Sequence, residues 1–290
     1  MSRILAIGIA TIDIVNLVSE YPSEDSEVRA LSQRVSRGGN ATNTLVVLSQ
    51  LGHRCSWGGV LAADADSTPI LADLHAHAID LSHCRRLSDG KNPVSYILLS
   101  QATGTRSIVH YRDLPEFDAA DFARIDLAGF DWLHFEGRNV AATRRMLERV
   151  RRERPELPLS LEIEKPRPGI EDLFGLADLL LFSRAYAAAS GHADASALLR
   201  YARGLAPRAD LVCSWGADGA HALGRDGRSA ASPAFPPPRV VDTLGAGDTF
   251  NAAIIDARLR GCTLEQALGD ACRLAGRKCG QHGLAGLAHG

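Results

Sequence analysis

The chain has 290 residues, a formal net charge of −2 and an ordinary share of hydrophobic and charged residues. Acidic and basic residues are mixed along it, and no segment approaches the ~20 consecutive apolar residues of a membrane helix, so we expect no nucleic-acid and no membrane partner. The six cysteines form no C-x-x-C pair. We therefore expect reduced thiols and a cytoplasmic protein.

Strand-like and helix-like segments alternate along most of the chain. The expected strands are apolar runs at Arg3–Ile9, Trp132–Phe135, Leu159–Ile163, Asp178–Phe182 and Asp210–Ser214. The expected helices are at Asn40–Leu51, Thr68–Ala78, Ala141–Arg152, around Phe174, and at Ala195–Arg203, Ala246–Leu259 and Leu264–Cys279. This alternation predicts an α/β fold with a mostly parallel sheet and helices on both of its faces.

Two pairs of strand-like segments interrupt the alternation. Thr11–Ser19 and Arg29–Ser36 flank a polar turn, and Val94–Ser100 and Arg106–Tyr111 flank Thr103-Gly104. Each pair is typical of an antiparallel hairpin. The two hairpins predict a small β-sheet lid, residues 11–36 and 94–112, on a core made of residues 1–10, 37–93 and 113–290.

A glycine-rich turn, Asp242-Thr243-Leu244-Gly245-Ala246-Gly247-Asp248, leads into the first of two late helices. Its small residues let the backbone approach a ligand, and the start of the helix points free N–H groups at the same place, which suits a phosphate. Asp248 is either an ordinary helix cap or a general base. At a helix N-terminus we expect it to be ionised and weakly basic. Phosphoryl transfer to a hydroxyl needs such a carboxylate beside the phosphates.

A second polar cluster opens the first helix. Gly39 allows close backbone approach, and Asn40 and Asn43, three residues apart, share one helix face. Their amides can donate to and accept from sugar hydroxyls, although Asn40 could also be a plain helix cap. Asp13 follows the first strand in an apolar setting, where a carboxylate needs a partner or a ligand. Asp25 lies in an acidic turn that could equally be a solvated loop.

These two motifs, about 200 residues apart, resemble the two signatures of the ribokinase-like (PfkB) carbohydrate kinases, G-G-N and D-T-x-G-A-G-D. The resemblance covers nearly the whole chain and is strongest to the ketohexokinase branch, which makes fructose 1-phosphate. The segments that carry this narrower resemblance are Tyr21–Glu27, Leu31–Arg34, Glu136–Asn139, Glu164–Arg167 and Phe235–Asp242. It implies the ribokinase-like three-layer α/β/α core with a β-sheet lid, and a homodimer that joins through its lids.

The resemblance also implies roles for individual residues. The residues implied to hold the sugar are Asp13, Gly39, Asn40 and Asn43, with Asp25 reaching the sugar of the partner subunit. The residues implied to bind ATP are Arg106, Trp215, Gly216, Ala217, Asp218, Gly219 and Cys279. Gly245, Ala246 and Gly247 would hold the phosphates, and Asp248 would act as the base.

One family motif is absent. Many ribokinase-like enzymes carry an N-x-x-E motif near the metal, but the corresponding segment of this chain reads Ser183-Arg184-Ala185-Tyr186. Ketohexokinases lack this motif too. The metal ligands are therefore unassigned, with Mg²⁺ expected to travel with ATP and Glu136 and Glu164 as candidates for supporting roles. Use of a monovalent cation stays open.

The sequence thus predicts an ATP-dependent transfer of the γ-phosphate to a ketose hydroxyl, with fructose converted to fructose 1-phosphate. Two alternatives stay open: a kinase of the same fold acting on another sugar or a nucleoside, and a sugar-binding regulator without catalysis. The intact G-A-G-D at 245–248 disfavours the regulator. A dehydrogenase is least expected, because no G-x-G-x-x-G follows the first strand.

Overall fold

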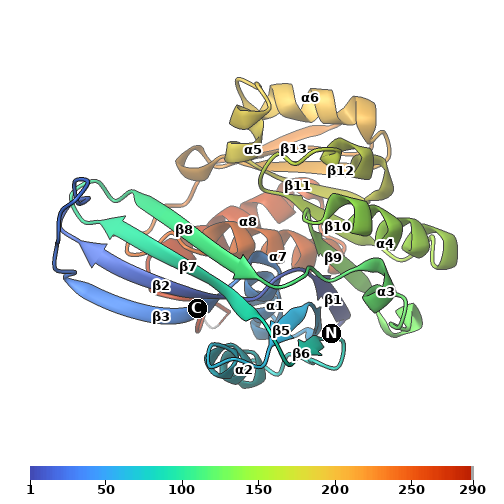
Figure 1. Cartoon of the computed structure of the whole chain (residues 1–290). Helices are drawn as coiled ribbons and strands as arrows, with labels where there is room; N and C mark the ends of the chain where they lie inside the picture. Colours follow the sequence, from blue (N-terminus) through green and yellow to red (C-terminus); the bar gives the residue numbers. More distant parts are fainter. Residues whose placement is uncertain (289–290) are drawn as a thin grey trace.

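An eight-stranded sheet runs through the centre of the computed structural model, which describes residues 1–288 (Figure 1). In spatial order its strands are β14 (Ser229–Ser232), β13 (Ala220–Leu223), β12 (Asp210–Ser214), β11 (Leu179–Ser183), β10 (Leu159–Ile163), β9 (Trp132–Glu136), β1 (Arg3–Ile7) and β4 (Arg54–Gly58). All neighbours from β12 to β4 are parallel, and β13 and β14 add an antiparallel edge.

Helices cover both faces of this sheet, because successive side chains of a buried strand point to opposite faces. In β1, Leu5 and Ile7 pack into one apolar cluster, and Ile4 and Ala6 pack into the other. The helices on the Ile4 side are α1 (Asn40–Gln50), α2 (Ser67–Ala76), α7 (Ala246–Leu259) and α8 (Leu264–Cys279). The helices on the Leu5 side are α3 (Ala119–Phe122), α4 (Val140–Glu153), α5 (Arg184–Ala189), α6 (Ala195–Leu205) and the 3₁₀ segments η1 (Leu127–Gly129) and η2 (Ile170–Leu176).

The predicted three-layer α/β architecture is confirmed. The late helices α7 and α8 have the predicted bounds. The strands that the sequence did not predict are β4, β13, β14 and a small parallel pair of β5 (Val60–Ala62) with β6 (Arg85–Leu87). They are short, and β14 (Ser-Ala-Ala-Ser) contains no β-branched or aromatic residue, so tertiary pairing rather than propensity creates them.

A separate four-stranded sheet projects from one side of the core (Figure 1). Its strands are, in spatial order, β3 (Ser32–Gly38), β2 (Thr11–Val18), β7 (Lys91–Ser100) and β8 (Arg106–Asp113). Both predicted hairpins pair antiparallel, and the parallel pairing of β2 with β7 joins them into one sheet. Within residues 1–288, no helix is long and apolar enough to cross a membrane.

Candidate active site

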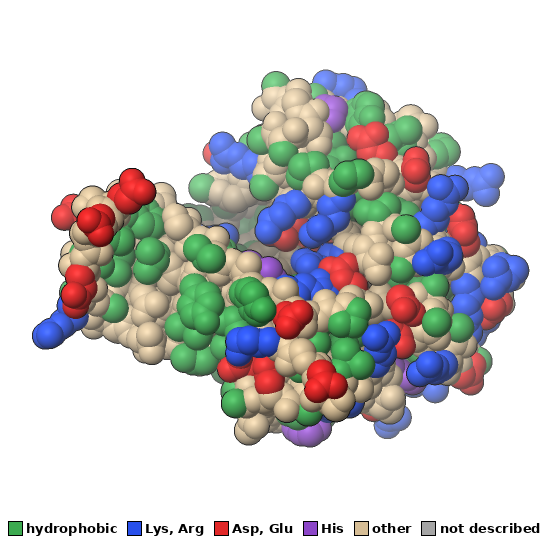
Figure 2. Space-filling view, in the orientation of Figure 1, with side chains coloured by type: hydrophobic (Ala, Val, Ile, Leu, Met, Phe, Trp, Pro, Cys, Tyr) green, Lys and Arg blue, Asp and Glu red, His purple; other side chains and the backbone are tan. Residues whose placement is uncertain are grey.

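A cavity of about 1100 Å³ lies between the four-stranded sheet and the core. Its lining includes Glu136 at the end of β9 and Ser214 at the end of β12, so it opens at the carboxyl ends of the parallel strands, where α/β sheets bind ligands. Figure 2 shows Lys and Arg side chains gathered around this hollow. The basic residues that line it include Arg138, Lys165 and Arg184.

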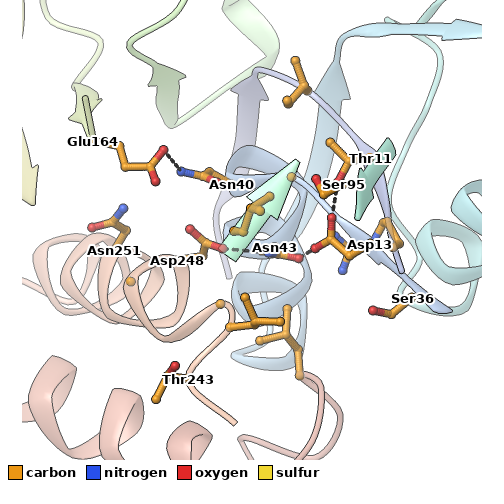
Figure 3. Close-up of a pocket in the computed structure, with 18 of the residues that line it drawn as sticks. Thr11, Asp13, Ser36, Asn40, Asn43, Ser95, Glu164, Thr243, Asp248 and Asn251 are labelled. Atoms are coloured by element: carbon orange, nitrogen blue, oxygen red, sulfur yellow. Dashed lines mark hydrogen bonds between the residues drawn. The ribbon is translucent and has the colours of Figure 1, made fainter. Parts of the chain in front are cut away.

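At the amino end of α1 the backbone leaves no room for a side chain at Gly38 or Gly39. Gly39 has φ +104°, and a Cβ there would lie 2.2 Å from the carbonyl oxygen of Ile9. A Cβ on Gly38 would lie 2.2 Å from the carboxylate of Asp13. The chain can therefore turn into α1 directly against Asp13, which brings Asn40 and Asn43 to the cavity (Figure 3).

The amino end of α7 faces that of α1. Gly245 caps α7 with φ +79°, and Asp248 follows in the first turn with 7% of its surface exposed. The amide of Asn43 donates to Asp248 Oδ2 over 2.7 Å, so a hydrogen bond joins the polar cluster at the start of α1 to the first turn of α7 (Figure 3).

Asp248 is a stronger base than the sequence indicated. Removal from water raises its pKa, and the negative charges of Glu164 and Glu136 raise it further, against the hydrogen bond from Asn43 and the charge of Arg37. The expectation of a weakly basic carboxylate, based on the helix terminus alone, was wrong because desolvation outweighs the helix dipole.

Three glutamates lie near Asp248, one at the end of β9, one within β10 and one directly after β10. Glu136 and Glu164, both singled out in the sequence, line the cavity. Glu136 accepts a hydrogen bond from the backbone N–H of Ile9 at 2.5 Å, and burial raises its pKa to about 7. Glu162 was missed, although a charged residue inside the apolar strand Leu159–Ile163 was a usable signal.

Asp13, on β2, also lines the cavity. Its carboxylate accepts from Thr11 Oγ1 over 2.9 Å, and burial raises its pKa. Arg37 donates to Asn43 Oδ1 over 2.7 Å. Asp13, Asn43 and Asp248 therefore lie along one wall of polar groups. Asp25 lies elsewhere, exposed in the turn between β2 and β3 and outside the cavity of its own chain.

The expected nucleotide residues are only partly brought together. Arg106, on β8, donates to Thr243 Oγ1 over 3.0 Å and lines the cavity with Gly216, Gly245 and Gly247. The expected residues that do not line this cavity are Trp215, Ala217, Asp218, Gly219, Ala246 and Cys279. Trp215 and Asp218 nevertheless contact a lining residue, because Arg184 stacks over the Trp215 ring and lies 3.5 Å from the Asp218 carboxylate.

Asp242, at the start of the glycine turn, is bound from two sides. Arg34 of β3 donates to its carboxylate over 2.8 Å, and the buried Lys278 lies 3.2 Å from the same carboxylate oxygen. Together with the bond between Arg106 and Thr243, this ties two strands of the four-stranded sheet to the turn. Among residues 1–288, no three His, Cys, Asp or Glu side chains group as metal ligands.

Comparison with known proteins gives a consistent result. The sequence profile of the pfkB family carbohydrate kinases matches residues 1–288. The chain is 42% identical to the ketohexokinase of Mus musculus over 98% of both chains. Among solved structures it resembles a ribokinase of Arabidopsis thaliana complexed with ribose and ATP, at TM-score 0.79, 18% identity and coverage of 97% and 94%. A nucleoside kinase of Burkholderia thailandensis in complex with inosine gives TM-score 0.78, 17% identity and coverage of 99% and 92%.

Proposed function

Because the chain belongs to the pfkB family of carbohydrate kinases, we propose that it transfers the γ-phosphate of ATP to fructose and makes fructose 1-phosphate. That it is a phosphotransferase acting on a sugar hydroxyl follows from the family itself. The observation that supports fructose is the 42% identity to a ketohexokinase over nearly the whole chain. The structural likeness to a nucleoside kinase, at 17% identity, concerns the fold alone.

In this proposal the sugar lies against the wall formed by Asp13, Gly39, Asn40 and Asn43. Asp248 accepts the proton of the hydroxyl that attacks the γ-phosphate. Its raised pKa suits the task, because a base works best when its pKa is near the working pH. The bond from Asn43 orients the carboxylate before the sugar arrives, and positioning is the main source of rate in phosphoryl transfer.

The phosphates of ATP would lie at the amino end of α7. The backbone N–H groups of Gly245 and Gly247 suit an anion there, whereas that of Ala246 already donates to the carbonyl oxygen of Thr243 over 3.3 Å. Arg106 reaches the same turn from β8. We place the rest of the nucleotide along Trp215–Gly219 and toward Cys279. Ser214 and Gly216 line the adjoining wall of the cavity.

Mg²⁺ would come with the ATP phosphates, whose charge it neutralises. The cavity offers oxygen donors of the type that Mg²⁺ prefers, at Glu164 and Asp248, but within residues 1–288 no three-residue ligand group. We therefore propose that these two carboxylates hold the ion through its water molecules. All six cysteines are free, which fits the proposed cytoplasmic setting.

We further propose that the four-stranded sheet is a lid and a dimer contact. Several of its large apolar side chains are exposed, among them Val35, Tyr96, Ile108 and Val109, the last with 69% of its surface in contact with water. An apolar surface of this kind favours association with a second copy. In such a dimer Asp25 would be free to reach the partner's sugar site.

The test is a panel of ketoses, aldoses and nucleosides with ATP and Mg²⁺, measured by ADP release. Turnover with fructose, and phosphate on O1 of the product, is the expected result. Turnover only with another sugar or a nucleoside would reject the proposed substrate, and no turnover at all would favour a regulator. Asp248→Asn should lower kcat by several powers of ten and leave ATP affinity nearly unchanged, because the amide cannot accept the proton. Near-normal kcat in this variant would remove Asp248 from the mechanism.

A further inference from the structure

A closed ring of five polar side chains joins α1, α7 and β10 at one end of the cavity. Asn40 and Asn43 are one turn apart on α1, and Asp248 and Asn251 are one turn apart on α7. Asn43 donates to Asp248 over 2.7 Å, which closes the ring on one side. Glu162 closes the other side, since its Oε1 accepts from both Asn40 and Asn251 over 3.1 Å. The ring therefore links Asp248, the proposed base, to α1 in two ways: directly through Asn43, and through Asn251 and Glu162 to Asn40.

The Asn40 amide has no hydrogen left for a ligand. An amide nitrogen carries two hydrogens. Asn40 Nδ2 donates to Glu162 Oε1 over 3.1 Å and to Glu164 Oε2 over 3.3 Å. The sequence suggested that Asn40 could both donate to and accept from a sugar. With both donors held by carboxylates, Asn40 presents only its carbonyl oxygen, so a bound hydroxyl must donate to it.

Glu162 is unusually placed for a residue with a purely structural role. It is 6% exposed and lines the cavity, and its Oε2 has no hydrogen-bond partner among the described residues. An unpaired buried carboxylate oxygen is costly and needs a reason. Burial raises the pKa of Glu162, and the nearby charge of Asp248 raises it further.

We propose that Glu162 is a positioning residue for phosphoryl transfer, which fixes the Asn40 amide as an acceptor for the sugar and holds α7 at Asn251, one turn from Asp248. The inference rests on the proposed phosphorylation of a sugar at this site, and it applies to any acceptor sugar, not to fructose alone. Removing Glu162 then disturbs the sugar and the base but not the nucleotide, whose proposed contacts lie on β8 and on the glycine turn.

Two substitutions separate the hydrogen bonds from the charge. Glu162→Ala removes both bonds, and we expect KM for the sugar to rise at least about tenfold and kcat to fall about tenfold, with KM for ATP within about twofold. Glu162→Gln keeps a carbonyl acceptor for Asn40 and Asn251, so KM for the sugar should stay within about threefold. For this variant kcat should also stay within about threefold of wild type, so the conservative change restores what Glu162→Ala loses.

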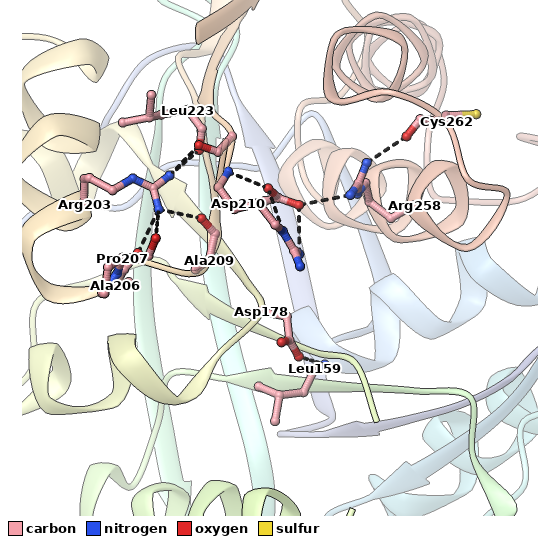
Figure 4. Close-up of polar contacts among 12 residues, drawn as sticks. Leu159, Asp178, Arg203, Ala206, Pro207, Ala209, Asp210, Leu223, Arg258 and Cys262 are labelled. Atoms are coloured by element: carbon pink, nitrogen blue, oxygen red, sulfur yellow. Dashed lines mark hydrogen bonds and ion pairs between the residues drawn. The ribbon is translucent and has the colours of Figure 1, made fainter. Parts of the chain in front are cut away.

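Asp210→Asn is the matched control. Asp210 is another buried carboxylate held by side chains from two other segments, Arg225 and Arg258, each at 3.1 Å (Figure 4). It begins β12, whose other end lines the cavity at Ser214. This variant should lower the melting temperature and leave the sugar KM and kcat unchanged.

The outcomes are distinct. If Glu162→Ala keeps the sugar KM and kcat within twofold of wild type, or if Glu162→Gln raises the sugar KM as much as Glu162→Ala does, the inference is overturned. Should Glu162→Ala not fold, Asn251→Ala, which removes the same bond from the side of α7, decides: a kcat within twofold of wild type would then overturn the inference. Absence of fructose turnover by the wild type would reject the proposed substrate, and the variants would then be measured with the sugar that the panel identifies.

Discussion

Glu136→Gln should make the stability of the protein less dependent on pH. The carboxyl group of Glu136 is buried at the end of β9, with 6% of the residue exposed, and accepts a hydrogen bond from the backbone N–H of Ile9 at 2.5 Å. Burial is the main cause that raises its pKa from an ordinary 4.5 to about 7. Glutamine has nearly the same shape, keeps an acceptor for that N–H and cannot ionise.

The sign and size of the effect follow from linkage. A carboxyl group whose pKa is higher in the folded state binds its proton more tightly there, so its contribution to stability is complete below pH 4.5 and is lost as the pH rises through about 7. Each pH unit between the two pKa values is worth about 1.4 kcal/mol, which gives roughly 3 kcal/mol in total. Most of this loss, about 2 to 3 kcal/mol, falls between pH 5 and pH 8.

The assay is urea denaturation of both proteins at several pH values from 5 to 8. The free energy of unfolding of Glu136→Gln minus that of wild type should increase by about 2 to 3 kcal/mol over this range. Glu148→Gln, on the exposed side of α4, is the control for removal of a surface carboxylate. If the difference in the free energy of unfolding between Glu136→Gln and wild type did not change with pH, burial would not raise the pKa of Glu136.

Two further predictions concern the four-stranded sheet. Arg106→Ala should raise KM for ATP about 10- to 100-fold through the loss of one charge-assisted phosphate contact; an unchanged KM for ATP with a raised sugar KM would contradict the proposed orientation of the two substrates. Val109→Asp places a charge on the most exposed of the large apolar residues of β8, and sedimentation should show a dimer for wild type and a shift toward monomer for the variant. A monomeric wild type at working concentration would reject the proposed dimer.

The sequence by itself determined the features that depend on neighbouring residues. The bounds of α7 and α8 were predictable because Gly245 and the Thr263 capping box start the two helices, and Gly261 and Gly280 follow close after their last residues. The spacing of Asn40 and Asn43 is enough to place both on one face of α1, because residues three apart are neighbours on any α-helix. The alternation of apolar strands and helices likewise predicted the parallel sheet and its two helical layers.

Only the tertiary structure decided which polar groups meet and how basic they are. Glu162 is 89 residues from Asn251 and 122 residues from Asn40, so no local pattern connects them. The pKa of Asp248 is raised by its removal from water and by carboxylates from distant parts of the chain. The helix N-terminus, which is visible in the sequence, favours a lower pKa. Local spacing follows from backbone geometry, but burial and long-range charge exist only once the chain has folded.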